Sequence, residues 1–136
     1  MAYSISEIEG IGPSTTEKLG AAGIKTTDDL LDHCASASGR EKTAAATGID
    51  KAKLLKFANM ADLMRVNGVG EEYSELLEAG GVDTVKELRH RVPANLHAKL
   101  AEVAAEGKVK VRRVPSASEC EKWVADAKTL EPKVTH

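Results

Sequence analysis

A repeat inside the sequence constrains the fold of this chain more than any other feature. Residues 8–30 read IEGIGPSTTEKLGAAGIKTTDDL and residues 66–88 read VNGVGEEYSELLEAGGVDTVKEL, which is the same pattern 58 positions later and without a gap. The glycines and the apolar positions agree between the two segments, whereas the polar positions differ. Agreement of this kind at a fixed offset is the signature of a duplicated structural unit. We therefore divide the chain into a first copy at about residues 5–65 and a second copy at about residues 66–131.

Apolar spacing predicts that both copies are helical. Over residues 51–64 the apolar side chains recur every three or four positions, which places them on one face of a helix. Residues 108–114, KVKVRRV, alternate as a strand would, but a single strand has no partner for a sheet, so we expect an extended connector there. The spacing of a helix capping box occurs at Ser38 with Glu41, Thr84 with Glu87 and Ser116 with Glu119. These patterns predict an all-α fold of about eight to ten short helices.

The size of each copy bears on the domain organisation. A unit of about 60 residues buries a small fraction of its surface, which makes it marginally stable alone. The alanine-rich helices allow close approach but supply little apolar area each. We therefore expect the two copies to share one core and to form a single compact domain over residues 1–136.

Each copy contains a loop in which two glycines flank one apolar residue. We name Gly10, Ile11 and Gly12 the first glycine loop, and Gly68, Val69 and Gly70 the second glycine loop. Glycine is required where φ is positive or where the backbone closely approaches another group. A helix is expected to start near Ser14, and the N–H groups at its N-terminus carry a partial positive charge that can hold a phosphate oxygen.

This arrangement resembles the helix-hairpin-helix motif, h-x-G-h-G-x-x-x-A-x-x-h, of DNA polymerases, ligases, glycosylases and Holliday-junction proteins. The tandem form, with MADLMRVNGVGEEYSELLEAGGVDTVKEL in the middle of the chain, is also similar to a prokaryotic family known only as a domain of unknown function built from duplicated helix-hairpin-helix units. The resemblance covers about residues 5–130. It implies a SAM-like fold, similar to the N-terminal domain of DNA polymerase beta. It also implies loops that approach the phosphate backbone without reading bases, often with a monovalent cation on the loop carbonyls.

The residues around the loops depart from that pattern. The resemblance implies a lysine or arginine two residues after the second glycine, whereas this chain has Ser14 and Glu72 there. A phosphate near Glu71 and Glu72 would meet like charge, which costs on the order of 1 kcal/mol or more at close range. The second glycine loop is therefore expected to be the weaker phosphate site, and the first is neutral.

The net charge of −2 hides a strong segregation of charge along the chain. The net charge is −4 over residues 5–32, +3 over 33–65, −5 over 66–87 and +5 over 88–115. Two interpretations stay open: acidic and basic faces that neutralise each other within the protein, or a basic strip for nucleic acid or an acidic partner. The best candidate for such a strip is a basic cluster that the first copy lacks, made of Lys108, Lys110, Arg112 and Arg113.

Composition excludes several classes of protein. The four aromatic residues are too few for the stacking platforms that bind bases. The sequence has no apolar run of about 18 residues and no basic-then-apolar start, so we expect a cytoplasmic protein without a membrane partner. Cys34 and Cys120 are too few for a disulfide framework and are not at metal-ligand spacing. No catalytic constellation stands out, so we expect no enzyme, cofactor or metal.

These features predict a non-enzymatic protein that binds nucleic acid, in particular the DNA backbone, weakly and without sequence preference. The alternative is a protein–protein interaction or scaffold module in which the hairpins are only architectural, which the acidic residues beside the second loop favour. The expected contacts are Gly10, Ile11, Gly12 and Ser14, the basic cluster Lys108, Lys110, Arg112 and Arg113, and more weakly Gly68, Val69 and Gly70.

Overall fold

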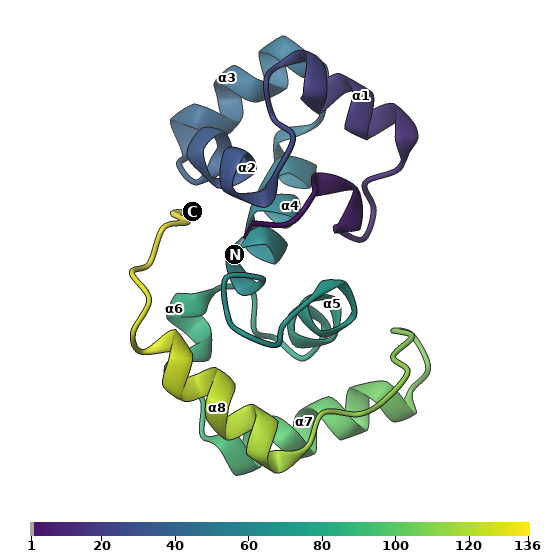
Figure 1. The fold of residues 1–136 in the computed structure, drawn as a ribbon, viewed down its shortest axis with the longest axis vertical. Helices are drawn as coiled ribbons and strands as arrows, with labels where there is room; N and C mark the ends of the chain where they lie inside the picture. Colours follow the sequence, from purple (N-terminus) through teal and green to yellow (C-terminus); the bar gives the residue numbers. More distant parts are fainter. Residues whose placement is uncertain (1) are drawn as a thin grey trace.

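The computed structural model describes residues 2–136, and all of its regular elements are helices (Figure 1). They are a 3₁₀ helix η1 (Ile5–Glu7) and the α-helices α1 (Pro13–Ala21), α2 (Thr27–Cys34), α3 (Ala37–Thr47), α4 (Lys51–Leu63), α5 (Glu71–Ala79), α6 (Val85–Leu88), α7 (Pro93–Ala105) and α8 (Ala117–Ala127). The prediction of an all-α fold is confirmed, and segment 108–114 forms no strand. Within residues 2–136, no helix has the length and apolar character needed to cross a bilayer.

The elements of the two copies follow the same order. Helices α1 and α5 each span nine residues, and each has a glycine at its N-cap, Gly12 or Gly70. Two residues earlier, Gly10 and Gly68 adopt φ angles of 93° and 87°, which glycine reaches without steric cost. The repeat in the sequence is thus matched by a repeat in backbone conformation.

An aromatic ring packs against each glycine loop. A Cβ atom built on Gly10 would lie 3.3 Å from Cε1 of Phe57, and one built on Gly68 would lie 3.3 Å from Nε1 of Trp123. Phe57 lies on α4 and Trp123 on α8, so the last helix of each copy supports the loop of that copy. The positive φ favours glycine at both positions, and a side chain there would also push the neighbouring ring outward by a few tenths of an ångström.

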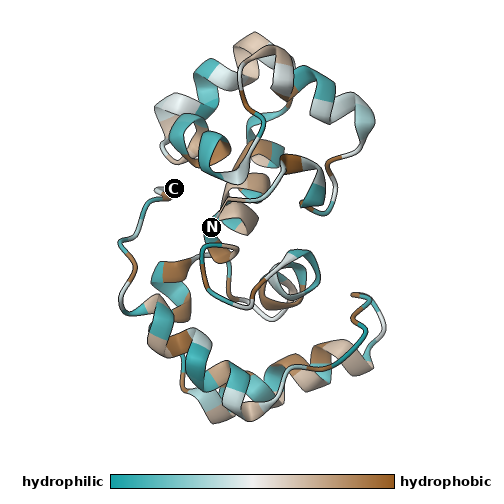
Figure 2. Ribbon diagram, viewed as in Figure 1, coloured by the Kyte–Doolittle hydropathy of each residue, from teal (hydrophilic) through white to brown (hydrophobic). Residues whose placement is uncertain are grey.

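The buried side chains form two clusters, whereas the sequence leads us to expect one shared core. One cluster lies in each copy, and the two meet at α4, which Figure 1 shows in the middle of the molecule. Met60 and Met64 belong to the first cluster, whereas Leu63 belongs to the second. Helix α4 is buried on more than one face, so it contributes side chains to both clusters. Figure 2 shows how apolar and hydrophilic residues alternate along the other helices, which bury one face each.

The observed N-caps of three helices can be compared with the predicted capping patterns. Ser116 and Glu119 form the predicted capping box at α8, and the Thr84 hydroxyl accepts a hydrogen bond from the Glu87 N–H. The prediction at Ser38 is wrong, because α3 starts two residues earlier and its cap is Ser36. The Ser36 hydroxyl accepts a hydrogen bond of 3.0 Å from the Gly39 N–H, and Gly39 itself lies so close to the His33 carbonyl of α2 that a side chain there would clash.

A buried carboxylate ties the two copies together at the end of α4. Asp62 is 1% exposed, and its Oδ2 accepts a hydrogen bond of 2.9 Å from the Val85 N–H at the start of α6. Its Oδ1 accepts a hydrogen bond of 2.6 Å from Nη1 of Arg65. The position of the second copy against α4 therefore depends on a charged group that water does not reach.

Candidate functional site

The first glycine loop presents its backbone to solvent while its apolar residue anchors it. The Ile11 side chain is buried, and the Ile11 N–H donates to the Ile8 carbonyl at 3.1 Å. Gly10, Gly12 and Ser14 are exposed. Helix α1 has no side-chain cap, and the N–H groups of Ser14 and Thr15 have no acceptor among residues 2–136. Unpaired N–H groups at the start of a helix favour an anion.

A hollow of about 440 Å³ adjoins this loop between α1 and α4. Its charged lining residues are Lys18, Lys53, Lys56, Glu9 and Asp50, which leaves an excess of one positive charge. The three lysines are exposed. Lys56 Nζ lies 4.0 Å from Oε1 of Glu78, while neither of the other two lysines forms an ion pair within the described chain.

These lysines are functional candidates that the predicted set of contacts omits. Lys53 and Lys56 lie one turn apart on α4, and the next residue, Phe57, carries the ring that packs against Gly10. The sequence shows that Lys53 and Lys56 are spaced to lie on one face of a helix. It does not show that this face lies beside the glycine loop, because the contact between Phe57 and Gly10 joins residues 47 positions apart.

The second glycine loop differs because the basic cluster folds onto it. The Arg112 N–H and Nε donate to the Glu72 carboxylate at 2.8 and 2.7 Å. The Tyr73 hydroxyl donates to the Arg113 carbonyl at 3.1 Å. The Arg113 guanidinium in turn donates to Glu119 at 2.6 and 3.0 Å. Both arginines of the cluster are therefore paired with a carboxylate, while their side chains stay exposed.

The ion pairs perturb the carboxylates that take part in them. Hydrogen bonds from the Arg112 main chain and side chain lower the pKa of Glu72. Hydrogen bonds from Arg113 and from the Ser116 N–H lower the pKa of Glu119 to about 2.

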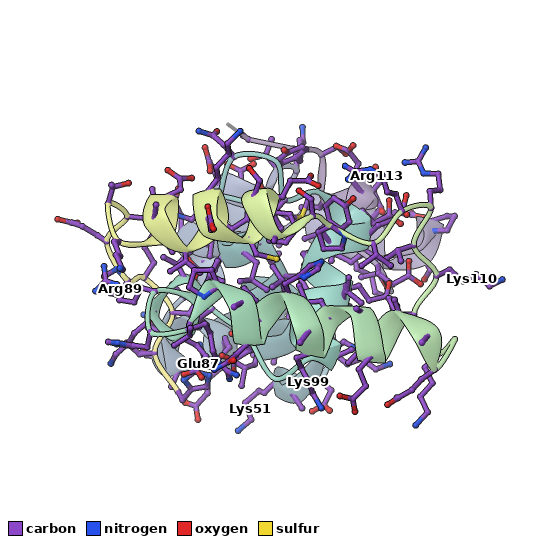
Figure 3. All side chains as sticks on the ribbon, turned by 90° about the horizontal axis from the view of Figure 1, so that it is seen from below. Lys51, Glu87, Arg89, Lys99, Lys110 and Arg113 are labelled. Atoms are coloured by element: carbon purple, nitrogen blue, oxygen red, sulfur yellow. The ribbon has the colours of Figure 1, made fainter. Side chains whose placement is uncertain are left out.

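The basic residues of the second copy do not gather at one place. Figure 3 shows Arg113 and Lys110 on the right of the view and Arg89 on the left.

Carboxylates separate the basic cluster from the lysines of the first loop. A second hollow, of about 600 Å³, is lined by Lys108, Lys110 and Arg112 and by four glutamates, Glu9, Glu71, Glu72 and Glu75. Glu9 lines both hollows. The structure therefore brings Gly10 together with Lys53 and Lys56, but it does not join them to the basic cluster in one continuous strip.

The glutamates of the second hollow repel one another. Desolvation, the close approach of the Glu9 carboxylate and the charges of Glu7 and Glu72 raise the pKa of Glu71. Desolvation and the charge of Glu9 also raise the pKa of Glu75. No group of three or more histidine, cysteine, aspartate or glutamate residues in the described part of the chain is arranged to hold a metal ion.

Replacing Glu71 by glutamine should therefore stabilise the protein at neutral pH, by at most about 1 kcal/mol because the group is exposed. The raised pKa means that the folded protein holds this proton more tightly than the unfolded chain does. Wild-type stability is then lost as the pH rises through the raised pKa. The gain should be complete near pH 7 and disappear below the ordinary value of 4.5. Urea denaturation at several pH values measures it.

Two further variants control this experiment. Glu121→Gln removes an exposed carboxylate that forms no ion pair among residues 2–136, and it should leave stability unchanged. Glu119→Gln should act in the opposite direction, because the lowered pKa of Glu119 contributes stability above pH 4.5 that is lost as the pH falls toward 2. A gain from Glu71→Gln that does not vary with pH would contradict charge repulsion as its cause.

The two cysteines lie away from both hollows. Both are fully buried, Cys34 in the first core and Cys120 in the second. Burial raises the pKa of both thiols, to about 11 for Cys120. The thiol form is a poor nucleophile and a poor metal ligand, so neither cysteine is a candidate for chemistry at neutral pH.

Comparisons with other proteins bear on the family of this chain. Neither the curated proteins nor the solved structures contain a match to it. A family model matches residues 9–130, a range that includes both glycine loops and all eight α-helices of the described chain. The chain therefore belongs to the family described as a domain of unknown function (DUF4332).

Proposed function

We propose that this protein is a non-enzymatic tandem helix-hairpin-helix protein that binds DNA, or another nucleic acid, through the phosphate backbone. The observation that carries the proposal is that two features which favour an anion both lie beside the first glycine loop. The uncapped start of α1 and the hollow with Lys18, Lys53 and Lys56 both adjoin the first glycine loop. A phosphate held by the Ser14 and Thr15 N–H groups would lie beside these ammonium groups.

Binding of this kind would be independent of base sequence. Lysines and main-chain N–H groups that contact phosphates fix the position of a protein on a nucleic acid but do not read bases. The rings that could stack on bases are used within the protein. Phe57 and Trp123 are buried, and Tyr73 packs against Trp123 with ring centroids 5.1 Å apart.

The second glycine loop would have an architectural role under this proposal. Glu72 stands where the related motif implies a basic residue, and its carboxylate is already paired with Arg112. One phosphate-binding loop for each chain is therefore expected, and the affinity should be weak.

Titration of the full chain with labelled DNA tests the proposal. Two duplexes of unrelated sequence and one single strand should bind with similar dissociation constants, in the non-specific range of about 10⁻⁴–10⁻⁶ M. For three phosphate contacts, the affinity should fall roughly 40-fold between about 50 and 200 mM salt. An absence of binding at the lower salt concentration would refute the proposal, and a strong preference for one duplex would refute the backbone mode.

The alternative is a protein-interaction module, and one observation favours it. The hollow of about 600 Å³ carries four carboxylates opposite three basic groups, a pattern that suits a charged protein surface. In that case the titration shows no nucleic-acid binding, and the glycine loops only turn the chain.

A further inference from the structure

The last residues of the chain cross from the second copy back to the first. Helix α8 ends at Ala127, and residues 131–136 have no regular secondary structure. In Figure 1 this segment runs from α8 past α6 and ends beside α2 and α3. It lies outside residues 9–130, which the family model matches.

The far end of this segment is anchored in the first copy. The Val134 side chain is buried, and it belongs to the first core although α8 belongs to the second. The Thr135 N–H donates to the Ala35 carbonyl at 2.8 Å, just beyond the end of α2. An apolar contact and a main-chain hydrogen bond therefore hold the same two residues.

A buried arginine forms part of the anchoring site. Arg40 is 5% exposed, and each of its three hydrogen bonds goes to a main-chain carbonyl: Cys34 at 3.0 Å, Ala35 at 2.9 Å and Thr135 at 2.6 Å. Two of these carbonyls lie at the end of α2, where the helix dipole favours a cation. The third comes from the crossing segment. A buried guanidinium is costly unless it is hydrogen-bonded, so the segment completes the environment of Arg40.

The middle of the segment is not held. Pro132 and Lys133 are exposed and form no hydrogen bond with any residue among 2–136. The preceding part is fixed by a hydrogen bond of 2.8 Å from Nη2 of Arg89 to the Leu130 carbonyl. Beyond the anchor, His136 Nε2 lies 3.7 Å from Oδ2 of Asp83, at the surface. The segment is therefore fixed at both ends, and no hydrogen bond within the described chain supports its middle.

We propose that residues 132–136 form a latch that fixes the position of the second copy relative to the first and can leave its site without either core unfolding. Two observations favour local release. The cores are separate clusters joined through α4, so neither contains the other. The latch contributes only one buried apolar side chain, Val134, to the first core. The release would uncover a socket for one apolar side chain, together with a guanidinium that lacks one acceptor. The proposal is independent of nucleic-acid binding.

Amide hydrogen exchange of the full chain, followed by NMR, tests local release. The Thr135 N–H should exchange roughly 100-fold faster than core amides such as that of Leu77, because local opening needs less free energy than global unfolding. Val134→Asp should remove the remaining protection of Thr135 and leave the core amides of both copies within about twofold of the wild type. The control is Lys133→Asp, which places a carboxylate at the adjacent, exposed position; it changes the charge by two units rather than one and should still change neither.

Residual dipolar couplings test the second part of the proposal. In the wild type, the couplings of the two copies should fit one alignment tensor. In Val134→Asp they should need two, because the copies reorient about α4. If Thr135 exchanges as slowly as the core, or if Val134→Asp deprotects the first core as a whole, the segment is an integral part of that core. If one tensor still fits the variant, α4 and the Asp62 contacts fix the copies without the segment. Either result would overturn the latch.

Discussion

Replacing Lys53 and Lys56 together by glutamine should weaken DNA binding about 100-fold at about 50 mM salt. Both side chains line the hollow beside Gly10, so each can neutralise a phosphate held at the first glycine loop. Each lost contact should also reduce the slope of log affinity against log salt by about one. The loss should be the same for unrelated sequences. Fluorescence anisotropy at several salt concentrations measures both quantities.

The stability of this double variant should change little. Lys53 forms no ion pair in the described chain, and Lys56 is 4.0 Å from Glu78 at an exposed position. Such a surface pair contributes at most about 1 kcal/mol. A loss of DNA binding in a folded variant can therefore be assigned to the removed charges.

The matched control removes two other lysines, Lys108 and Lys110, also by glutamine. They belong to the basic cluster and line the other hollow, where four carboxylates offset their charge, so their loss should lower the affinity less than about threefold. The opposite result, with a large loss in this control and none in Lys53→Gln with Lys56→Gln, would place the interface on the cluster. It would contradict the assignment to the first loop.

Asp62→Ala should cost about 3–5 kcal/mol of unfolding free energy, because it breaks a buried charge pair. The side chains of Asp62 and Arg65 are only 1% and 14% exposed. Removal of the carboxylate leaves the guanidinium without its partner in a site that excludes most water. It also leaves the Val85 N–H without an acceptor at the junction of the two copies. Urea denaturation of both proteins measures the difference.

Asp126→Ala is the matched control for Asp62→Ala. Asp126 Oδ2 also accepts a hydrogen bond from a main-chain N–H, that of Asn67 at 2.9 Å, but this bond is exposed. Water can replace the lost acceptor there, so the cost should stay near or below 1 kcal/mol. If the two variants lost equal stability, burial would not be the reason for the contribution of Asp62.

Local rules explain how much of the fold could be predicted. The helix over 51–64 and the capping box at Ser116 have the predicted form, because each depends on residues within one or two turns. The start of α3 could not be predicted from the Ser38 spacing, since Ser36 also has a hydroxyl that can cap a helix and it accepts the hydrogen bond from the Gly39 N–H.

The candidate site was predictable only in part. The glycine pattern marks the position of the first glycine loop, because such a pattern is local. The sequence does not place Lys53 and Lys56 beside that loop, and it offers Arg112 as a free basic group. The Arg112–Glu72 pair joins residues 40 positions apart, so no local spacing indicates it.

The sequence by itself determined the helical class, the duplication and the two glycine loops, because apolar periodicity and glycine positions act over a few residues. Only the tertiary structure decided which charges neutralise each other, which remain beside the first loop, and how the copies are joined through α4, Asp62 and Arg40. A sequence records the sign and number of its charges. Their effect depends on contacts of about 3 Å and on loss of solvent, and both arise only when distant segments pack together.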